Sequence, residues 1–370
     1  MSEVKVPFID LKQRYIEEKE ELLACVERVM SKGHFILTPE VAEFEARICA
    51  FTGAKHCVAL NSGTDALMMG LMAMGIGRGD EVITAPNSFV ASAASIAHIG
   101  ATPAFADVRD DQNMDPVDLE RRITPRTKAI MPVHWTGRIA DMRAIQAIAD
   151  KHGLQIIEDS AQSMGAFYHG QHGGTFGRVG GFSAHPLKNF NAAGDGGFML
   201  TSDDAIAKHC RTYRNHGLED RNTCAMFGVN SRLDSLQAEI LSFRLTRLES
   251  VTERRRKNVL LYRSLIKAPE VFMPPCKPHE KNAFVMFIVQ CDRRDQLKAF
   301  LQERGIESLV YYPTPIHLQP AAAKLGYKRG DFPVTERQAD RVLALPHHQN
   351  LTQGQIAMVS EAVNAFYGAH

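Results

Sequence analysis

Short apolar runs alternate with amphipathic stretches between residues 40 and 200, and this alternation constrains the fold more than any other feature of the 370-residue chain. Five runs have the length and apolar content of buried strands: residues 56–60, 81–85, 102–108, 128–133 and 154–158. Helical patterns separate them, for example at residues 66–74 and 140–152. Strands and helices that alternate at this spacing imply right-handed crossovers, and they predict a mainly parallel sheet buried on both faces.

The length of the chain predicts two domains, because a single core stops growing near ~250–300 residues. Residues 232–266 are predicted to form one long helix, rich in Leu, Glu and Arg, that leads into the second domain. Beyond this helix the patterns predict one strand and two helices, at residues 282–290, 294–304 and 335–345. We therefore predict an α/β fold, with a large domain at residues 1–245 and a smaller α+β domain at residues 246–370.

Composition and charge argue against nucleic acid and membrane partners. Hydrophobic residues make up 45% of the chain, the net charge is +1 and the pI is about 7.7, so no broad positive field is available for polyanions. The seven cysteines lack a C-x-x-C pair, which is typical of reduced thiols rather than a disulfide framework or a zinc site. No apolar leader and no run of ~18 apolar residues is present. A cytoplasmic protein is expected.

Lys188 and Asp159 are the first candidate catalytic residues. Asp159 directly follows a buried-looking run, where an ionised carboxylate is costly unless a cation or a strong donor meets it. Lys188 follows a second strand-like segment, and strand ends of a parallel sheet gather at one crevice. A lysine that forms a Schiff base must be neutral, which desolvation can achieve. The plainer alternatives are a solvated lysine, and an aspartate that caps a helix or forms a surface ion pair.

The turn Ser62-Gly63-Thr64 lies where a strand-like run leads into a helical one. Backbone N–H groups and the helix dipole at such a point favour an anion of phosphate size, and the two hydroxyls add donors. A simple helix N-cap is the alternative interpretation. Together with Asp159 and Lys188, the turn supplies three elements of one cofactor site in chain order.

A series of short motifs extends over nearly the whole chain. They are residues 7–12 (PFIDLK), 63–67 (GTDAL), 79–83 (GDEVI), 88–91 (SFVA), 123–130 (ITPRTKAI), 158–162 (EDSAQ), 228–238 (GVNSRLDSLQA) and 312–319 (YPTPIHLQ). With the lysine segment, they resemble the DegT/DnrJ/StrS-type sugar aminotransferases, which are pyridoxal phosphate enzymes of the aspartate aminotransferase fold (fold type I). The resemblance implies a large cofactor-binding domain around a mainly parallel, seven-stranded sheet.

The resemblance also implies a role for each candidate cofactor residue. Lys188 would form the Schiff base with pyridoxal 5'-phosphate and then move the proton between cofactor and substrate. Asp159 would keep the pyridine nitrogen protonated, so that the ring acts as an electron sink. Gln162 would contact the 3-hydroxyl side of the ring and Phe89 would stack on it, although an aromatic in an apolar segment is more often a core residue.

The phosphate site implied by the resemblance requires two subunits. Its residues would be Ser62, Gly63, Thr64 and Ser183, joined by Asn230 from a second subunit. A homodimer with active sites at the subunit interface is therefore expected to be part of the mechanism.

The implied reaction moves an amino group from an amino acid donor, by family analogy glutamate, to a keto carbon of a nucleotide-linked sugar in amino-sugar biosynthesis. The Tyr-Pro-x-Pro-x-His-x-Gln pattern favours carbon 3 over carbon 4. Residues expected near the sugar are Arg232, Tyr311, Tyr312 and His317. Plainer interpretations are a helix cap beside Asp234 for Arg232 and an ordinary strand position for Tyr311.

Two departures from the family pattern and two rival functions remain. Trp135 stands where many relatives have Leu or Tyr, and Thr38 replaces a frequent glycine. A metal site at His169, His172 and His185 is disfavoured, because no cysteine or carboxylate lies at ligand spacing. One rival is a pyridoxal phosphate-dependent sugar dehydratase, in which the lysine is replaced. The other is a non-catalytic regulatory protein of the same fold, against which the absence of a DNA-binding segment argues.

Overall fold

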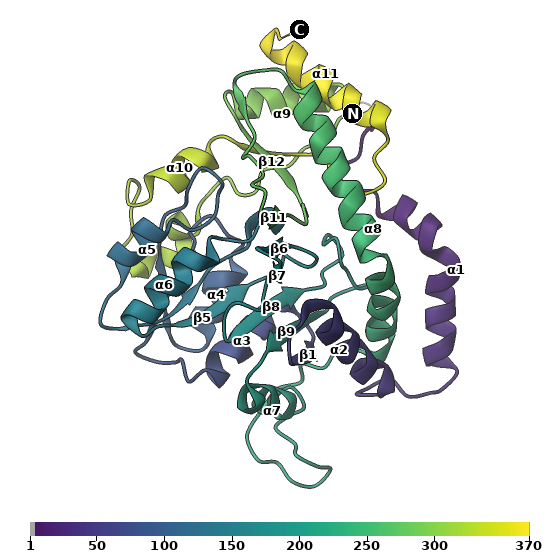
Figure 1. The fold of residues 1–370 in the computed structure, drawn as a ribbon, viewed down its shortest axis with the longest axis vertical. Helices are drawn as coiled ribbons and strands as arrows, with labels where there is room; N and C mark the ends of the chain where they lie inside the picture. Colours follow the sequence, from purple (N-terminus) through teal and green to yellow (C-terminus); the bar gives the residue numbers. More distant parts are fainter. Residues whose placement is uncertain (1–3, 370) are drawn as a thin grey trace.

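The computed structural model describes residues 4–369, and a seven-stranded sheet forms its centre (Figure 1). The strands are β1 (His56–Leu60), β2 (Glu81–Thr84), β3 (Thr102–Phe105), β4 (Thr127–Met131), β5 (Gln155–Asp159), β8 (Val179–Ser183) and β9 (Gly197–Thr201). Their order is β1-β9-β8-β5-β4-β2-β3, and β9 alone runs antiparallel to its neighbours. The predicted α/β fold with a mainly parallel, seven-stranded sheet is confirmed.

Helices cover both faces of this sheet, as the apolar strands require. One face packs against α3 (Gly63–Ala73), α4 (Ala91–His98) and α7 (Asp204–Tyr213). The other packs against α2 (Pro39–Thr52), α5 (Pro116–Arg122), α6 (Met142–His152) and the first half of α8 (Ser235–Leu265). In β1, Val58 and Leu60 belong to one core, whereas Cys57 and Ala59 belong to the other. Each strand therefore buries side chains on both faces.

The C-terminal part has a three-stranded antiparallel sheet of its own. It contains β10 (Val271–Phe272), β12 (Phe287–Cys291) and β13 (Val342–Leu345), with α9 (Arg294–Glu303) and α11 (Gln353–Tyr367) packed beside it. The second half of α8 joins this core through Val259 and Tyr262, and Val6 joins it from the N-terminal segment. The predicted domain boundary at 245/246 falls inside α8 and stays a prediction.

Residues 335–345 do not form the single helix that was predicted. Helix α10 (Pro333–Ala339) ends at Ala339, inside this range, and strand β13 begins at Val342. The four residues of β13 are all buried and pair with β12, so sheet formation in the core outweighs the helical pattern.

The remaining elements lie around these two sheets. Helix α1 (Leu11–Met30) packs along α8, and a small sheet is formed by β6 (Phe167–Tyr168), β7 (Gln171–His172) and β11 (Glu280–Lys281) (Figure 1). The short helices are η1 (Trp135–Gly137), η2 (Ile316–Leu318) and η3 (Pro320–Leu325). Within residues 4–369, no helix is long and apolar enough to span a bilayer.

Candidate active site

A cavity of about 460 Å³ lies at the carboxyl ends of β1, β2, β4, β5 and β8. The N-terminal segment contributes Phe8 and Ile9 to its wall, and the C-terminal part contributes Val285 and Met286. Ten of the predicted site residues line it: Ser62, Gly63, Thr64, Phe89, Asp159, Gln162, Ser183, Lys188, Tyr311 and Tyr312. The sheet thus brings together side chains that are far apart in the sequence, at the edge where parallel sheets usually bind ligands.

The turn before α3 forms a narrow cradle against the start of β9. Ser62 is the N-cap of α3, and its Oγ accepts a hydrogen bond from the N–H of Asp65 over 3.1 Å. A Cβ atom on Gly197 would lie 2.2 Å from the carbonyl carbon of Ser62, and one on Gly63 would lie 2.9 Å from the Cβ of Ser183. Only glycine permits this approach. Because the first N–H groups of a helix lack partners within it, the cradle fits a phosphate.

Lys188 projects into the site after β8 and is partly buried. Removal of its ammonium group from water lowers the pKa of Lys188, and the nearby carboxylate of Asp159 opposes this shift. The lowered pKa increases the fraction of neutral amine, which is the form that attacks a carbonyl carbon.

Asp159 is 6% exposed at the end of β5, and both of its carboxylate oxygens are hydrogen-bonded. Oδ2 accepts from the hydroxyl of Ser92 over 2.6 Å, and Oδ1 accepts from the N–H of Ala161 over 3.2 Å. Ser92 is itself within 2.7 Å of the hydroxyl of Ser88, which lines the cavity. These contacts fix the direction in which Asp159 presents its oxygens.

Gln162 and Phe89 lie on other parts of the wall. The side-chain oxygen of Gln162 accepts from the N–H of Thr136 over 2.8 Å, so its NH₂ group is the end available for a ligand. Phe89 is 53% exposed, and its ring centroid lies 6.0 Å from that of Tyr312. Phe89 is therefore not a core residue, which was the alternative interpretation of this position.

Glu158 supports the site from the face of β5 opposite Asp159. Its carboxylate accepts 2.7 Å hydrogen bonds from the N–H groups of Gly174, Phe176 and Gly177, and a fourth from His134. His134 Nδ1 accepts from the N–H of Ala140, so Nε2 must carry the proton that is donated to Glu158. Sequence reasoning missed both this pair and Ser92. A serine four residues after Ser88, on the first turn of a helix, was the available signal for Ser92.

Three predicted residues do not line the cavity. Asn230 is exposed, and its backbone oxygen accepts from Asn61 Nδ2 over 3.0 Å. Arg232 donates to Asn230 Oδ1 and to Asn215 Oδ1 at 3.1 and 3.0 Å. His317 is 2% exposed and forms a 3.0 Å hydrogen bond with Glu336. The roles assigned to these three residues stay predictions.

The three histidines considered for a metal lie in different surroundings. The ring of His169 stacks on that of His279, with centroids 4.3 Å apart. His172 is buried, and its Nε2 accepts from the N–H of Gly165, whereas His185 is exposed on the cavity wall. Among residues 4–369, no group of three or more potential ligand residues is arranged to hold a metal.

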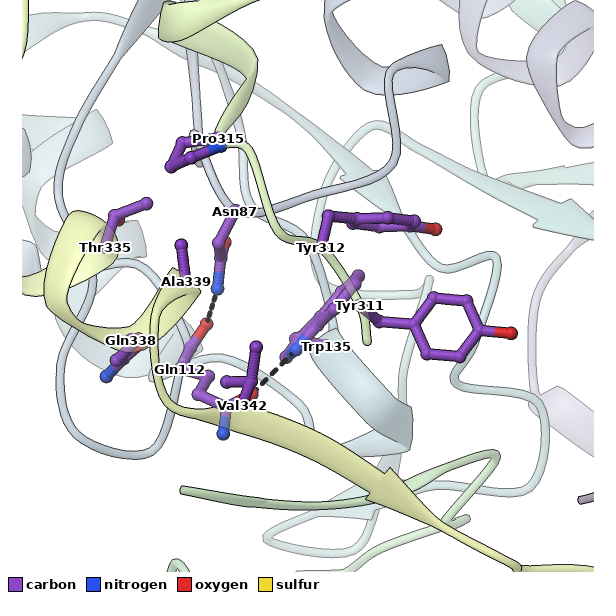
Figure 2. Close-up of a pocket in the computed structure, with 10 residues that line it drawn as sticks. All are labelled: Asn87, Gln112, Trp135, Tyr311, Tyr312, Pro315, Thr335, Gln338, Ala339 and Val342. Carbon is purple, nitrogen blue, oxygen red and sulfur yellow. Dashed lines mark hydrogen bonds between the residues drawn. The ribbon is translucent and has the colours of Figure 1, made fainter. Parts of the chain in front are cut away.

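A second, much smaller cavity of about 10 Å³ lies behind Tyr311 and Tyr312, lined also by Asn87, Gln112, Trp135 and Gln338 (Figure 2). Tyr311 and Tyr312 line both cavities. They separate the larger one from the loop that follows β3 and from α10.

Comparison with known proteins identifies the family of the chain. The model of the DegT/DnrJ/EryC1/StrS aminotransferase family matches residues 16–364. The chain belongs to this family. Among curated relatives, a "pleiotropic regulatory protein" of Geobacillus stearothermophilus is 42% identical over 98% of this chain and 99% of its own length. The dTDP-3-amino-3,4,6-trideoxy-alpha-D-glucose transaminase of Streptomyces venezuelae is 40% identical over 97% and 95%.

Further family members agree with this placement. The UDP-2-acetamido-2-deoxy-3-oxo-D-glucuronate aminotransferase of Pseudomonas aeruginosa is 39% identical over 97% of this chain and 99% of its own length. Among solved structures, S. venezuelae DesV in complex with a ketimine intermediate superposes with a TM-score of 0.96 at 40% identity, over 100% of both chains. The ntda protein of Bacillus subtilis with bound cofactor PMP superposes with a TM-score of 0.90 at 28% identity, over 98% of this chain and 86% of that one. The predicted family and enzyme class, aminotransferase, are confirmed.

Proposed function

We propose that this member of the DegT/DnrJ/EryC1/StrS family is a pyridoxal phosphate-dependent aminotransferase that transfers an amino group from an amino acid to a keto carbon of a nucleotide-linked sugar. The observation that carries the proposal is the convergence of Lys188, Asp159 and the turn Ser62-Gly63-Thr64 on one cavity. The family match over residues 16–364 supports the reaction class. Lys188 also argues against the dehydratase rival, whose members replace this residue.

The side chains present fit the cofactor. The N–H groups at the start of α3 lack partners within the helix, and together with the hydroxyls of Ser62, Thr64 and Ser183 on the same cavity they would hold its phosphate. Asp159 would meet the ring nitrogen. When bound, pyridoxal phosphate supplies the electron sink that stabilises negative charge at the reacting carbon.

The chain itself supplies covalent attachment, orientation and proton transfer. Lys188 Nζ is the amine that would hold the cofactor covalently, and as a free amine it would take and return the proton at the reacting carbon. Phe89 would cover one face of the ring, and the NH₂ group of Gln162, whose side-chain oxygen already accepts from Thr136, would donate toward the 3-oxygen. Each of these groups would act on one atom of the cofactor or the substrate, and the folded chain holds the groups in place before either binds.

On the substrate side we favour glutamate as donor and carbon 3 as the aminated position. The transaminase of S. venezuelae and the aminotransferase of P. aeruginosa described above carry a 3-amino or a 3-oxo sugar in their names. Of the four candidate sugar residues, Tyr311 and Tyr312 have the stronger support, because both line the cavity. Their rings are 5.3 Å apart and nearly perpendicular, so they present one edge and one face to a ligand.

We also propose a homodimer in which Asn230 completes the site of the partner. Asn230 is exposed and lies outside the cavity of its own chain. Large apolar side chains are exposed on α1 and on the loop after it: Leu11, Tyr15, Ile16, Leu23, Val26, Met30, Phe35, Ile36 and Leu37. A second copy would remove this apolar surface from water.

The test of the proposed function is a product assay. Purified protein is supplied with pyridoxal phosphate, glutamate and, in parallel, a 3-keto and a 4-keto nucleotide-linked sugar, and products are identified by mass. The proposal predicts an amino-sugar from the 3-keto substrate, formed together with 2-oxoglutarate, and none with Lys188→Ala. A sugar that loses water without gaining an amine supports the dehydratase. Cofactor binding without transfer from any amino acid supports a regulatory protein, as the name of the G. stearothermophilus relative suggests.

A further inference from the structure

The wall behind the two tyrosines contains the only tryptophan of the chain. Trp135 is 2% exposed, and its Nε1–H donates to Gln112 Oε1 over 2.9 Å (Figure 2). Its backbone N–H donates to Asn113 Oδ1 over 3.1 Å. The loop that follows β3 therefore fixes both the indole ring and the backbone of Trp135.

Gln112 is the residue on which this arrangement depends. It is 3% exposed and has a left-handed backbone, with a φ of 70°. Its backbone oxygen accepts from Asn87 Nδ2 over 2.8 Å, while its side-chain oxygen accepts from Trp135 (Figure 2). Because Asn87 precedes Phe89 by two positions, Gln112 holds the indole and the segment that carries Phe89 at the same time.

A chain of aromatic contacts leads from Trp135 to the larger cavity. The Trp135 ring lies 5.9 Å from the Tyr312 ring, which lies 6.0 Å from the Phe89 ring. Tyr312 and Phe89 line the larger cavity, whereas Trp135 and Gln112 do not. The N–H of Thr136, the residue after Trp135, donates to Gln162 in the same wall.

The space behind the tyrosines leaves little freedom for these rings. The cavity between Gln112, Trp135 and Tyr312 measures about 10 Å³, which is about the volume needed for one water molecule. A close-packed wall of this kind transmits a change at its rear to its front surface, because its side chains cannot relax independently.

We propose that Gln112 and Trp135 are positioning residues, whose hydrogen bond sets the orientation of Tyr312 and Phe89 against the cofactor and the sugar. This inference rests on the proposed function, because it concerns the wall of the same site. Neither residue touches the reacting atoms. Their loss should therefore weaken binding of cofactor and sugar, and raise the KM for the sugar more than it lowers kcat.

The test is a double-mutant cycle of Gln112→Leu, Trp135→Phe and the two combined. Either single change leaves one buried polar group without a partner, whereas the double change removes both. We expect each single variant to weaken cofactor binding about tenfold, and the double variant to weaken it by clearly less than the product of the two. Gln155→Leu is the control, since Gln155 lies at the opposite end of β5, where its side chain donates to Met74 O and accepts from Arg178 away from the cavity.

Three readouts separate positioning from a general structural role. They are the dissociation constant of the cofactor, the split between KM and kcat for the keto-sugar, and the visible circular dichroism of the bound cofactor, which reports how its ring is oriented in the protein. Variants that melt at lower temperature but match the wild type in all three overturn the proposal. Trp135→Phe retains most of the ring volume and provides the test if Gln112→Leu does not fold.

Failure of the proposed function would give a different experimental result from failure of the positioning role. If the wild-type protein binds no pyridoxal phosphate, the function and this role fail together. If the wild type binds and transfers normally while both single variants and Gln155→Leu behave alike, only the positioning role is overturned.

Discussion

The hydroxyl of Ser92 donates to Asp159 Oδ2 over 2.6 Å, so a side chain on the first turn of α4 determines how the acid at the end of β5 faces the cavity. Ser92 is fully buried, and no solvent competes for this contact. A hydrogen bond to a charged group contributes about 1.5–3 kcal/mol. The contact links the helix that follows β2 with the end of β5, although β4 lies between these two strands in the sheet.

Ser92→Ala is predicted to weaken cofactor binding about tenfold, because Asp159 loses a charge-assisted donor and gains freedom to turn. Ser95→Ala is the matched control. Ser95 is also fully buried on α4, but its hydroxyl bonds the backbone oxygen of Ser92 and does not contact Asp159. Spectroscopic titration with pyridoxal phosphate measures the cofactor affinity of both variants. Equal affinities for the two variants would contradict the role of Ser92.

Gly197→Ala is predicted to abolish cofactor binding. Its Cβ would meet the backbone of Ser62 at 2.2 Å and displace the turn before α3, and backbone cannot yield as a flexible side chain can. Gly354→Ala, whose Cβ would be 4.0 Å from the nearest atom, Thr352 Oγ1, should leave binding unchanged. Equilibrium dialysis with pyridoxal phosphate distinguishes the two, and tight binding by Gly197→Ala would refute the cradle.

Mixed dimers test whether Asn230 acts on the site of the partner. We expect Lys188→Ala to be inactive and Asn230→Ala to be impaired through weaker phosphate binding. When the two variants are refolded together, one site of each mixed dimer combines an intact Lys188 with an intact Asn230 of the other chain. Activity should therefore recover on mixing. Absence of recovery, with mixed dimers demonstrated by size and mass, would place Asn230 in its own chain's site or outside both.

Protonation of His172 is predicted to destabilise the fold in acid. Burial lowers the pKa of His172 from 6.5 to about 4. Its Nδ1–H donates to Gly173 O and its Nε2 accepts from the N–H of Gly165, so a proton on Nε2 would remove an acceptor. Between pH 6.5 and about 4, the unfolded chain therefore binds more protons than the folded one. The free energy of unfolding then falls as the pH falls.

The size of this effect is on the order of 3 kcal/mol when the pH drops from ~6.5 to ~4. Denaturant titrations at a series of pH values measure it. His172→Phe should be less stable than the wild type at pH ~7, because Gly165 loses its acceptor, but should lose less further stability toward pH ~4. An unchanged slope in this variant would show that other groups cause the acid sensitivity.

Local patterns were sufficient to predict most of the large domain. The run at residues 56–60 coincides with β1, and residues 232–266 contain α8, since apolar periodicity reports directly on burial. The pattern failed at residues 335–345, where β13 is stabilised by pairing with β12 and not by its local sequence. Strand pairing between distant segments is not visible in a local window.

Some features of the candidate site could likewise be predicted from local sequence, and others could not. The placement of Lys188, Asp159 and the turn at Ser62 on one cavity could be predicted, because each lies at the end of a recognisable strand or in the segment that follows it. The contacts of Ser92 with Asp159 and of Gln112 with Trp135 could not be predicted, because each joins two segments that only the folded sheet brings together. The position of His317, buried beside Glu336, likewise depends on how α10 packs.

The most direct test of the account is to locate the covalent attachment. The protein is loaded with pyridoxal phosphate, reduced with borohydride, digested and examined by peptide mass spectrometry, with Lys188→Ala treated in parallel. We predict that the added cofactor mass lies on Lys188 and is absent from the variant. A cofactor attached to another lysine, or none attached to the wild type, would contradict the assignment of this cavity as an aminotransferase site.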